Sequence, residues 1–146
     1  MLRRDYEGQE CSIARALEVV GERWTLLIVR DALLGLRRFD EFRASLGIAR
    51  NVLTDRLNRL VDEGILERVR YCERPERFEY HLTRKGHELN IALAGLRQWG
   101  DRYLSEKPPQ IVRRKSDRKP VVAALVPKGA PVLRLEDVET VPGPRS

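Results

Sequence analysis

Residues 39–64 of this 146-residue chain read FDEFRASLGIARNVLTDRLNRLVDEG, and their spacing predicts two short helices joined by a tight turn. The first helix covers residues 39–46, with acids in its first turn, where the helix dipole favours them, and it ends at Gly47. The second covers about residues 50–63 and places one apolar face inward: Leu53, Leu57, Leu60 and Val61. Two short helices joined in this way form a helix-turn-helix.

Two more helices are expected before this motif. Ser12 can cap the first of them, and Gly21 then stops it. The second, at residues 25–34, is apolar almost all round and ends at Gly35. A helix with this pattern belongs in the middle of a hydrophobic core.

After Gly64 the apolar period changes from that of a helix to that of a strand. Two strands are expected from the following positions: Ile65, Val69 and Tyr71, then Phe78, Tyr80 and Leu82. Residues 72–77, CERPER, would form the charged tip of this β-hairpin. Thr83 can cap a last helix over about residues 84–104, roughly 30 Å long. This is more than a small core needs, which suggests a partner helix.

Seven of the eight prolines follow Ser105, so the end of the chain is expected to be a tail. Its densest basic run is residues 113–119, and residues 121–126 and 132–141 could be short strands. The sequence thus predicts a class that is mainly α with a small β-hairpin (α+β), in three parts. These are an N-terminal arm at residues 1–10, a domain at residues 11–104 and a Pro-rich basic tail at residues 105–146.

The composition narrows the function. With 42% hydrophobic and 34% charged residues, one globular domain is expected. The net charge of +6 favours a polyanionic partner or an anionic membrane surface. No apolar run approaches the ~20 residues that span a bilayer, so the expected location is the cytoplasm, away from membranes. Two cysteines are too few for a disulfide framework, which fits a reducing compartment.

The outward face of the second helix of the motif carries side chains that can read base edges. Because its leucines face the core, five positions are left to project outward: Arg50, Asn51, Thr54, Asp55 and Asn58. Arginine suits guanine, asparagine suits adenine, and threonine can contact either base or a thymine methyl group. We therefore expect this helix to enter the major groove of double-stranded DNA.

Further arginines flank this helix and are expected to contact the sugar–phosphate backbone. They are Arg37, Arg38 and Arg43 at the first helix of the motif, and Arg74 and Arg77 at the hairpin tip. Glu73 and Glu76 would oppose the tip arginines, which leaves the contribution of the hairpin open. Any one of these arginines could equally be a solvated surface charge.

A series of motifs occurs in order along residues 11–104. They are Cys11, LEVVGERW (17–24), TLLIVRDALL (25–34), GLRRFDEF (35–42), GIARNVLTDRLNRL (47–60), EGIL (63–66), PERFEYHLT (75–83), Lys85-Gly86 and Trp99-Gly100. In these motifs the chain resembles the HxlR-type family of winged helix-turn-helix regulators, within the broader group of MarR regulators. The tail beyond Ser105 is longer than in many members, and the resemblance implies nothing for it.

The resemblance implies a homodimer, joined through the N-terminal helix and the long last helix, that represses or activates transcription at pseudo-palindromic operators. Two-fold symmetry would place the two recognition helices about 34 Å apart. The sequence departs from the family at Ala49, where a serine commonly caps the recognition helix. Alanine caps poorly, at a cost of about 1 kcal/mol.

In some members of the family, a cysteine at the position of Cys11 senses oxidants or electrophiles. Cys11 lies just before a predicted helix, whose N-terminus favours the reactive thiolate. The alternative is a small packing residue near the dimer interface. Cys72 has no counterpart in the family pattern, and the nature of any small-molecule or oxidant signal is left open.

The sequence does not support metal binding or catalysis. His81 and His87 have no metal-ligand spacing, and the residue sets of an enzyme are missing, so no metal, cofactor or catalytic residue is expected. One alternative function is a winged-helix module used for protein contacts. RNA binding is a weaker alternative, because the aromatic residues fit core or strand positions rather than exposed stacking positions.

Overall fold

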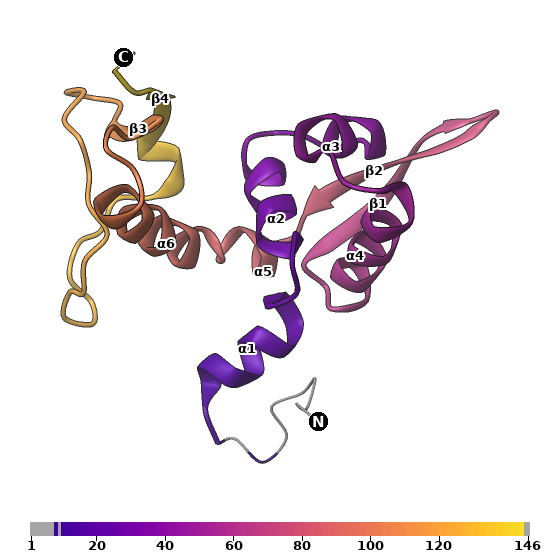
Figure 1. Ribbon diagram of the computed structural model, residues 1–146, viewed down its shortest axis with the longest axis horizontal. Helices are drawn as coiled ribbons and strands as arrows, with labels where there is room; N and C mark the ends of the chain where they lie inside the picture. Colours follow the sequence, from indigo (N-terminus) through magenta and orange to yellow (C-terminus); the bar gives the residue numbers. More distant parts are fainter. Residues whose placement is uncertain (1–7, 9, 145–146) are drawn as a thin grey trace. The chain divides into compact units, whose positions relative to one another are not determined.

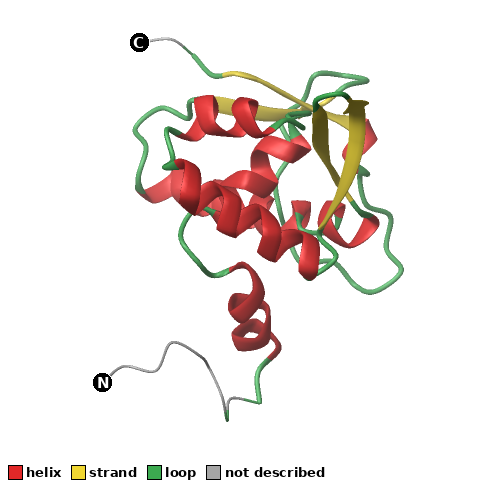
Figure 2. Ribbon diagram, turned by 90° about the vertical axis from the view of Figure 1, so that its right-hand side faces the viewer, coloured by secondary structure: helices red, strands yellow, loops and turns green. Residues whose placement is uncertain are grey.

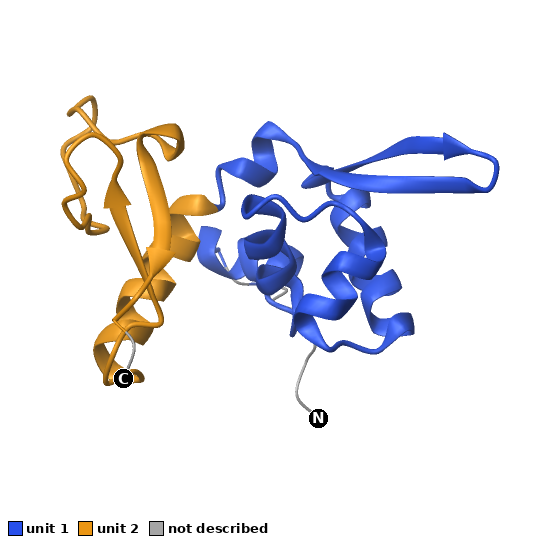
Figure 3. Cartoon of the chain, turned by 90° about the horizontal axis from the view of Figure 1, so that it is seen from above, with its two compact units in different colours: residues 1–89 blue, residues 90–146 orange. Residues whose placement is uncertain are grey.

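The computed structural model describes residue 8 and residues 10–144. Backbone contacts divide the chain into two compact units, residues 1–89 and residues 90–146, which Figure 3 distinguishes by colour. Most of the N-terminal arm expected at residues 1–10 lies outside the described residues. No helix in the described part of the chain is both long and apolar enough to cross a membrane.

The first unit holds the helix-turn-helix and a hairpin that follows it (Figure 1). The helices are α1 (Ser12–Val20), α2 (Thr25–Leu33), α3 (Phe39–Leu46), α4 (Arg50–Asp62) and the short α5 (Arg84–His87). The strands are β1 (Leu66–Glu73) and β2 (Glu76–Leu82), paired antiparallel. This is the predicted winged helix-turn-helix fold, mainly α with a small β-hairpin.

The core of this unit forms where α2, α3 and α4 meet. Its side chains without solvent exposure are Ile28, Val29, Phe42, Leu53, Leu57 and Leu60. The last three lie on one side of α4, as their spacing predicts. Gly47 makes the turn between α3 and α4 with a φ of +63°, a conformation that glycine adopts at little cost. Ala49 precedes α4 without a side-chain cap, as expected.

The hairpin is longer than predicted. Its register pairs Leu66 with Leu82 and Glu73 with Glu76, so only Arg74 and Pro75 remain at the tip. The prediction that residues 72–77 form the tip included too many residues. Strand pairing depends on backbone hydrogen bonds, so it can include residues with charged side chains. The ladder is irregular between Arg70 and Cys72.

The start of α1 and the last predicted helix differ from expectation. Cys11, not Ser12, is the N-cap of α1, and it provides no side-chain hydrogen bond. The helix expected at residues 84–104 is two helices, α5 and α6 (Asn90–Tyr103). Thr83 caps α5 as predicted, by accepting a hydrogen bond from the Gly86 amide at 3.1 Å. The Leu89 amide then bonds three residues back, to the Gly86 carbonyl, and this tighter pattern interrupts the helix.

The second unit contains α6 and a small antiparallel sheet of β3 (Gln110–Arg114) and β4 (Val138–Pro142), with the 3₁₀ turn η1 (Leu135–Asp137) before β4. The expected strand at residues 121–126 is wrong, and the one expected at 132–141 is a strand only from Val138. Prolines 120 and 127, which lack an amide donor, bound residues 121–126. This segment instead bonds to α6 through Gln98.

Candidate nucleic-acid interface

The five residues predicted to read bases lie exposed on α4. Arg50, Asn51, Thr54, Asp55 and Asn58 are all solvent-exposed, whereas the leucines of the same helix are buried. Positions at i, i+1, i+4, i+5 and i+8 share one side of a helix. The fold therefore brings these side chains together on one surface, which we call the reading face.

The side chains of the reading face differ in whether their polar groups already contact other groups of the protein. The Thr54 hydroxyl donates to the Arg50 carbonyl at 2.9 Å, and an Asp55 oxygen lies 2.7 Å from Nη1 of Arg56. The Arg50 guanidinium lies 5.2 Å from the centre of the Phe39 ring. Within the described part of the chain, the side-chain amides of Asn51 and Asn58 make no hydrogen bond, so both are available to a ligand.

The arginines at α3 are not equivalent. Arg38 lies 3.4 Å from Glu79 on β2, measured from Nε to Oε2, and its guanidinium is 4.3 Å from the centre of the Tyr71 ring. These contacts join the start of α3 to the hairpin and partly neutralise the charge. Arg37 and Arg43 are exposed and have no ion pair among the described residues. They are therefore better placed than Arg38 to meet a phosphate.

Glu79 is the acidic residue that ties the hairpin to α3. Nε2 of His81 lies 3.2 Å from Oε1 of Glu79. Hydrogen bonds from His81 and, to a lesser extent, from Arg38 hold the pKa of Glu79 below its ordinary value, because they stabilise the carboxylate. The contact therefore joins a carboxylate to a guanidinium at neutral pH.

The hairpin carries more positive charge than the sequence reading assigned to it. The predicted Arg74 and Arg77 are exposed near the tip. Arg68 and Arg70, which sequence reasoning missed, are also exposed on β1 and pair with Tyr80 and Phe78 on β2. The spacing of Arg68 and Arg70 could have predicted this, because alternate residues of a strand lie on the same face of the sheet.

Acidic side chains offset part of this charge. Nη1 of Arg70 lies 3.7 Å from Glu76, and the Arg68 guanidinium lies 4.2 Å from the centre of the Phe78 ring. A hollow between the start of α3 and the hairpin is lined by basic, acidic and aromatic side chains: Arg38, Phe39, Asp40, Glu41, Tyr71, Arg77 and Phe78. The hairpin therefore presents both charge and aromatic surface next to α3.

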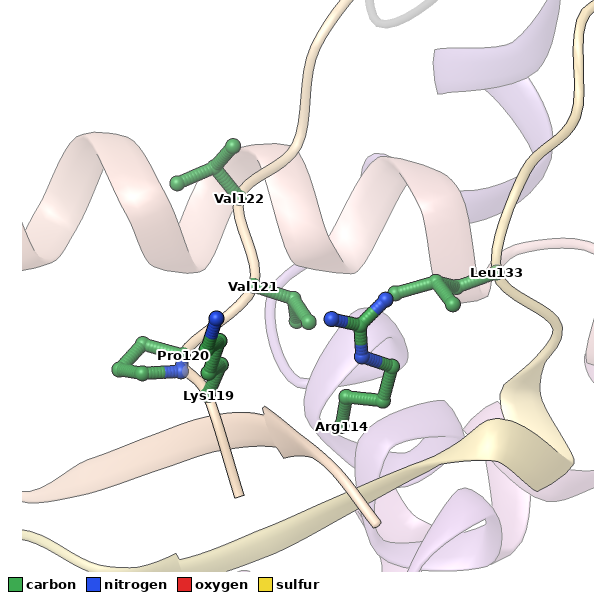
Figure 4. Close-up of a pocket in the computed structure, with 6 residues that line it drawn as sticks. All are labelled: Arg114, Lys119, Pro120, Val121, Val122 and Leu133. Carbon is green, nitrogen blue, oxygen red and sulfur yellow. The ribbon is translucent and has the colours of Figure 1, made fainter. Parts of the chain in front are cut away.

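The basic run of the tail is partly neutralised inside the second unit. Arg113 lies 2.7 Å from Glu139 on the paired strand, and Nε of Arg114 donates to Asp117 at 3.0 Å. Figure 4 shows Arg114 and Lys119 at a hollow that Val121 and Leu133 also line. This run is therefore less available to DNA than its composition suggests.

The two cysteines are free thiols. Cys11 is exposed at the start of α1, and Cys72 is half-buried on β1.

The two histidines contact other groups of the protein. His81 contacts Glu79, and Nδ1 of His87 lies 3.0 Å from the Thr83 carbonyl oxygen. Across residue 8 and residues 10–144, no group of three or more metal-ligating side chains comes together.

Comparison with known proteins agrees with this geometry. The model of the HxlR-like helix-turn-helix family matches residues 19–108. The uncharacterized HTH-type transcriptional regulator Rv3095 of Mycobacterium tuberculosis is 52% identical over 106 residues, which are 71% of this chain and 66% of that protein. The chain thus matches slightly less than two thirds of the length of this relative.

Solved structures resemble the chain as well. PA1607, described as a candidate transcription factor, is 42% identical with a TM-score of 0.72, over 84% of this chain and 87% of that one. The redox regulator HypR in its reduced form is 30% identical with a TM-score of 0.60, over 66% of this chain and 98% of HypR.

A helix-turn-helix followed by an antiparallel hairpin defines a winged helix-turn-helix protein. The match to the family model covers more than half of the chain, and it includes α2, α3, α4 and the hairpin. The protein belongs to the HxlR-like helix-turn-helix family. Its relatives are named as transcriptional regulators, not as enzymes.

Proposed function

We propose that the protein is a transcriptional regulator that binds double-stranded DNA at specific sites. The observation that carries this proposal is the reading face of α4, which collects one arginine, two asparagines, a threonine and an aspartate opposite three buried leucines. These side chains match the donor and acceptor patterns of bases in the major groove, which is wide enough for one helix. The family membership supports the same function.

In this proposal, α4 reads bases while flanking arginines bind phosphates. Arg37 lies just before α3 and Arg43 lies on α3, which precedes α4 in the motif. Arg74 and Arg77 extend the basic surface along the hairpin. Phosphate contacts fix the register of a protein on the duplex but carry no sequence information. Arg38 contributes less, because Glu79 and Tyr71 already engage it.

We further propose that the protein acts as a homodimer on a pseudo-palindromic operator. Each unit has apolar side chains that its own residues leave uncovered. On α1 they are Ile13, 72% exposed, and Leu17, 39% exposed. On α6 they are Ile91, Leu96, Trp99 and Tyr103, and no residue of α6 is buried. A second copy would remove this apolar surface from water.

A redox response is the second candidate function. Cys11 is an exposed free thiol at the start of α1, and α1 belongs to the surface proposed for dimerisation. The similar protein HypR is named a redox regulator. Oxidation of Cys11 would add a polar or bulky group at that surface and thereby alter the dimer.

Selection of DNA fragments tests the main proposal. Purified protein is mixed with sheared genomic DNA of its source, and the bound fragments are titrated against random duplex at several salt concentrations. Enrichment of a palindromic site with affinity far above that for random DNA supports the proposal. If no fragment is enriched by either the reduced or the oxidised protein, the module for protein contacts is favoured instead.

A further inference from the structure

Two arginines of α4 outside the reading face contact the end of α1 and the turn that follows it. Nε of Arg56 donates to the Arg23 carbonyl at 3.0 Å, and its Nη1 lies 3.0 Å from Oε2 of Glu22. Nη2 of Arg59 donates to the Glu18 carbonyl at 3.3 Å. The Arg56 side chain is only 19% exposed despite its charge. Both arginines therefore join the recognition helix to a distant part of the sequence.

These contacts matter because α1 is otherwise held weakly. Figures 1 and 2 show α1 projecting from the other helices of residues 1–89, and Val20 at its end is the one buried residue of this helix. The last carbonyls of a helix have no partner within the helix, and a cation there also meets the negative end of the helix dipole. Arg59 donates a hydrogen bond to the Glu18 carbonyl and places a positive charge at this end of α1.

The turn that Arg56 holds is itself unusual. Trp24, directly after Arg23, has a φ of +81°, which is the left-handed region that residues other than glycine seldom adopt. Such a conformation persists only where the surrounding structure fixes it. The bond from Arg56 to the Arg23 carbonyl contributes to fixing this turn, which connects α1 to α2.

We propose that Arg56 and Arg59 are positioning residues that link the recognition helix to the end of α1. Through this link, a displacement of α1 by a signal or by the dimer partner would change the orientation of the reading face. Arg56 also holds Asp55, and so it fixes one member of that face directly. The inference rests on the proposed function of α4 in reading DNA.

The test compares a positioning role with direct phosphate binding. The dissociation constants of Arg56→Gln and Arg59→Gln are measured on the selected fragment and on random duplex over a series of salt concentrations. We expect Arg56→Gln to weaken the selected complex about tenfold, because hydrogen bonds to charged groups are lost. Arg59→Gln should act in the same direction by less. Affinity for random duplex and the salt dependence should not change.

Arg43→Gln provides the contrast, because Arg43 is proposed to touch a phosphate. This variant should weaken binding to both DNAs alike and lower the slope of log K against log salt by about one. If Arg56→Gln behaves like Arg43→Gln, or binds the selected fragment as the wild type does, the inference is overturned. Glu22→Gln completes a double-mutant cycle with Arg56→Gln. A loss in Glu22→Gln alone that adds nothing to the loss in Arg56→Gln shows that the two side chains act as one unit, and fully additive losses contradict this.

A measurement without DNA separates failure of this inference from failure of the proposed function. Hydrogen exchange of the amides at residues 20–28 should be faster in Arg56→Gln than in the wild type. Unchanged exchange at Leu53, Leu57 and Leu60 would show that the core is intact. Unchanged exchange at residues 20–28 overturns the link, whatever the DNA result. A wild type that selects no fragment contradicts the proposed function but not this link.

Discussion

Arg38, at the start of α3, lies 3.4 Å from Glu79 on β2, so one ion pair joins the helix-turn-helix to the hairpin. The backbone follows the same connection, because the Tyr80 amide donates to the Arg37 carbonyl at 2.7 Å. The hairpin is thus attached beside the first helix of the motif rather than only through its own two ends. Its orientation relative to the reading face depends on this attachment.

The first prediction concerns the pH dependence of this contact. The pKa of Glu79 is lowered from 4.5, so the contact stabilises the fold above about pH 4.5 and the contribution is lost as the pH falls through the lower, folded pKa. Glu79→Gln should therefore lower the melting temperature at neutral pH and lower it less under acid conditions. Thermal melts between about pH 3 and 7 measure this. Glu67→Gln, which removes an exposed carboxylate of β1, is the matched control. An equal difference at all pH values would contradict the prediction.

The second prediction concerns Gly86 in α5. A Cβ at this position would overlap the Ile65 carbonyl oxygen and lie 2.8 Å from Cδ2 of Leu82. Because the nearest atom belongs to the backbone, Gly86→Ala should destabilise the protein by about 1–3 kcal/mol. Urea unfolding measures the difference. Arg84→Ala, which changes an exposed side chain of the same helix, should stay within about 0.5 kcal/mol. Equal stability of the two variants would be inconsistent with the close packing of Gly86.

The third prediction concerns the tail. The Gln98 side chain accepts from the Ala123 amide at 2.8 Å and donates to the Ala123 carbonyl at 2.9 Å. Gln98→Ala should remove both bonds and accelerate hydrogen exchange of the Ala123 amide. Gln98→Glu keeps the acceptor and loses the donor, so its effect should be intermediate. Protection of Ala123 that survives Gln98→Ala would show that other contacts hold residues 121–126.

The fourth prediction concerns the proposed homodimer. Trp99 is 58% exposed, and its ring centre lies 5.6 Å from that of Tyr103 on the same helix. An apolar pair of this kind gains most from burial against a second copy. Trp99→Asp should therefore shift the protein from dimer to monomer in analytical ultracentrifugation. Ser116→Asp, in an exposed turn of the tail, should leave the dimer intact. A wild-type protein that is monomeric at all concentrations would refute the proposal.

The sequence predicted the parts of the fold that depend on local periodicity. The spacing of Leu53, Leu57 and Leu60 defined α4 and its buried side, and glycine at position 47 marked the turn before it. The same spacing identified the exposed reading face. These features need no knowledge of distant contacts, because helix period and turn conformation are local properties.

Other features depend on tertiary contacts and could not be predicted in this way. Gly86 of α5 lies close against the Ile65 carbonyl, and residues 121–126 bond to Gln98 instead of forming a strand. Arg56 reads as one more surface charge, yet it binds carbonyl and carboxylate groups about thirty positions earlier in the sequence. Partners of long polar side chains are not encoded in spacing, because such side chains can reach several neighbouring elements.

Asn51 provides the most direct test of sequence-specific DNA binding by the reading face. Its side-chain amide is exposed on α4 and makes no hydrogen bond within the described residues. The measurement is the affinity of wild type and Asn51→Ala for the selected fragment and for random duplex at one salt concentration. We predict a loss of about 1–3 kcal/mol on the selected fragment and little change on random duplex. An equal loss on both DNAs, or no loss on either, would contradict base reading by α4.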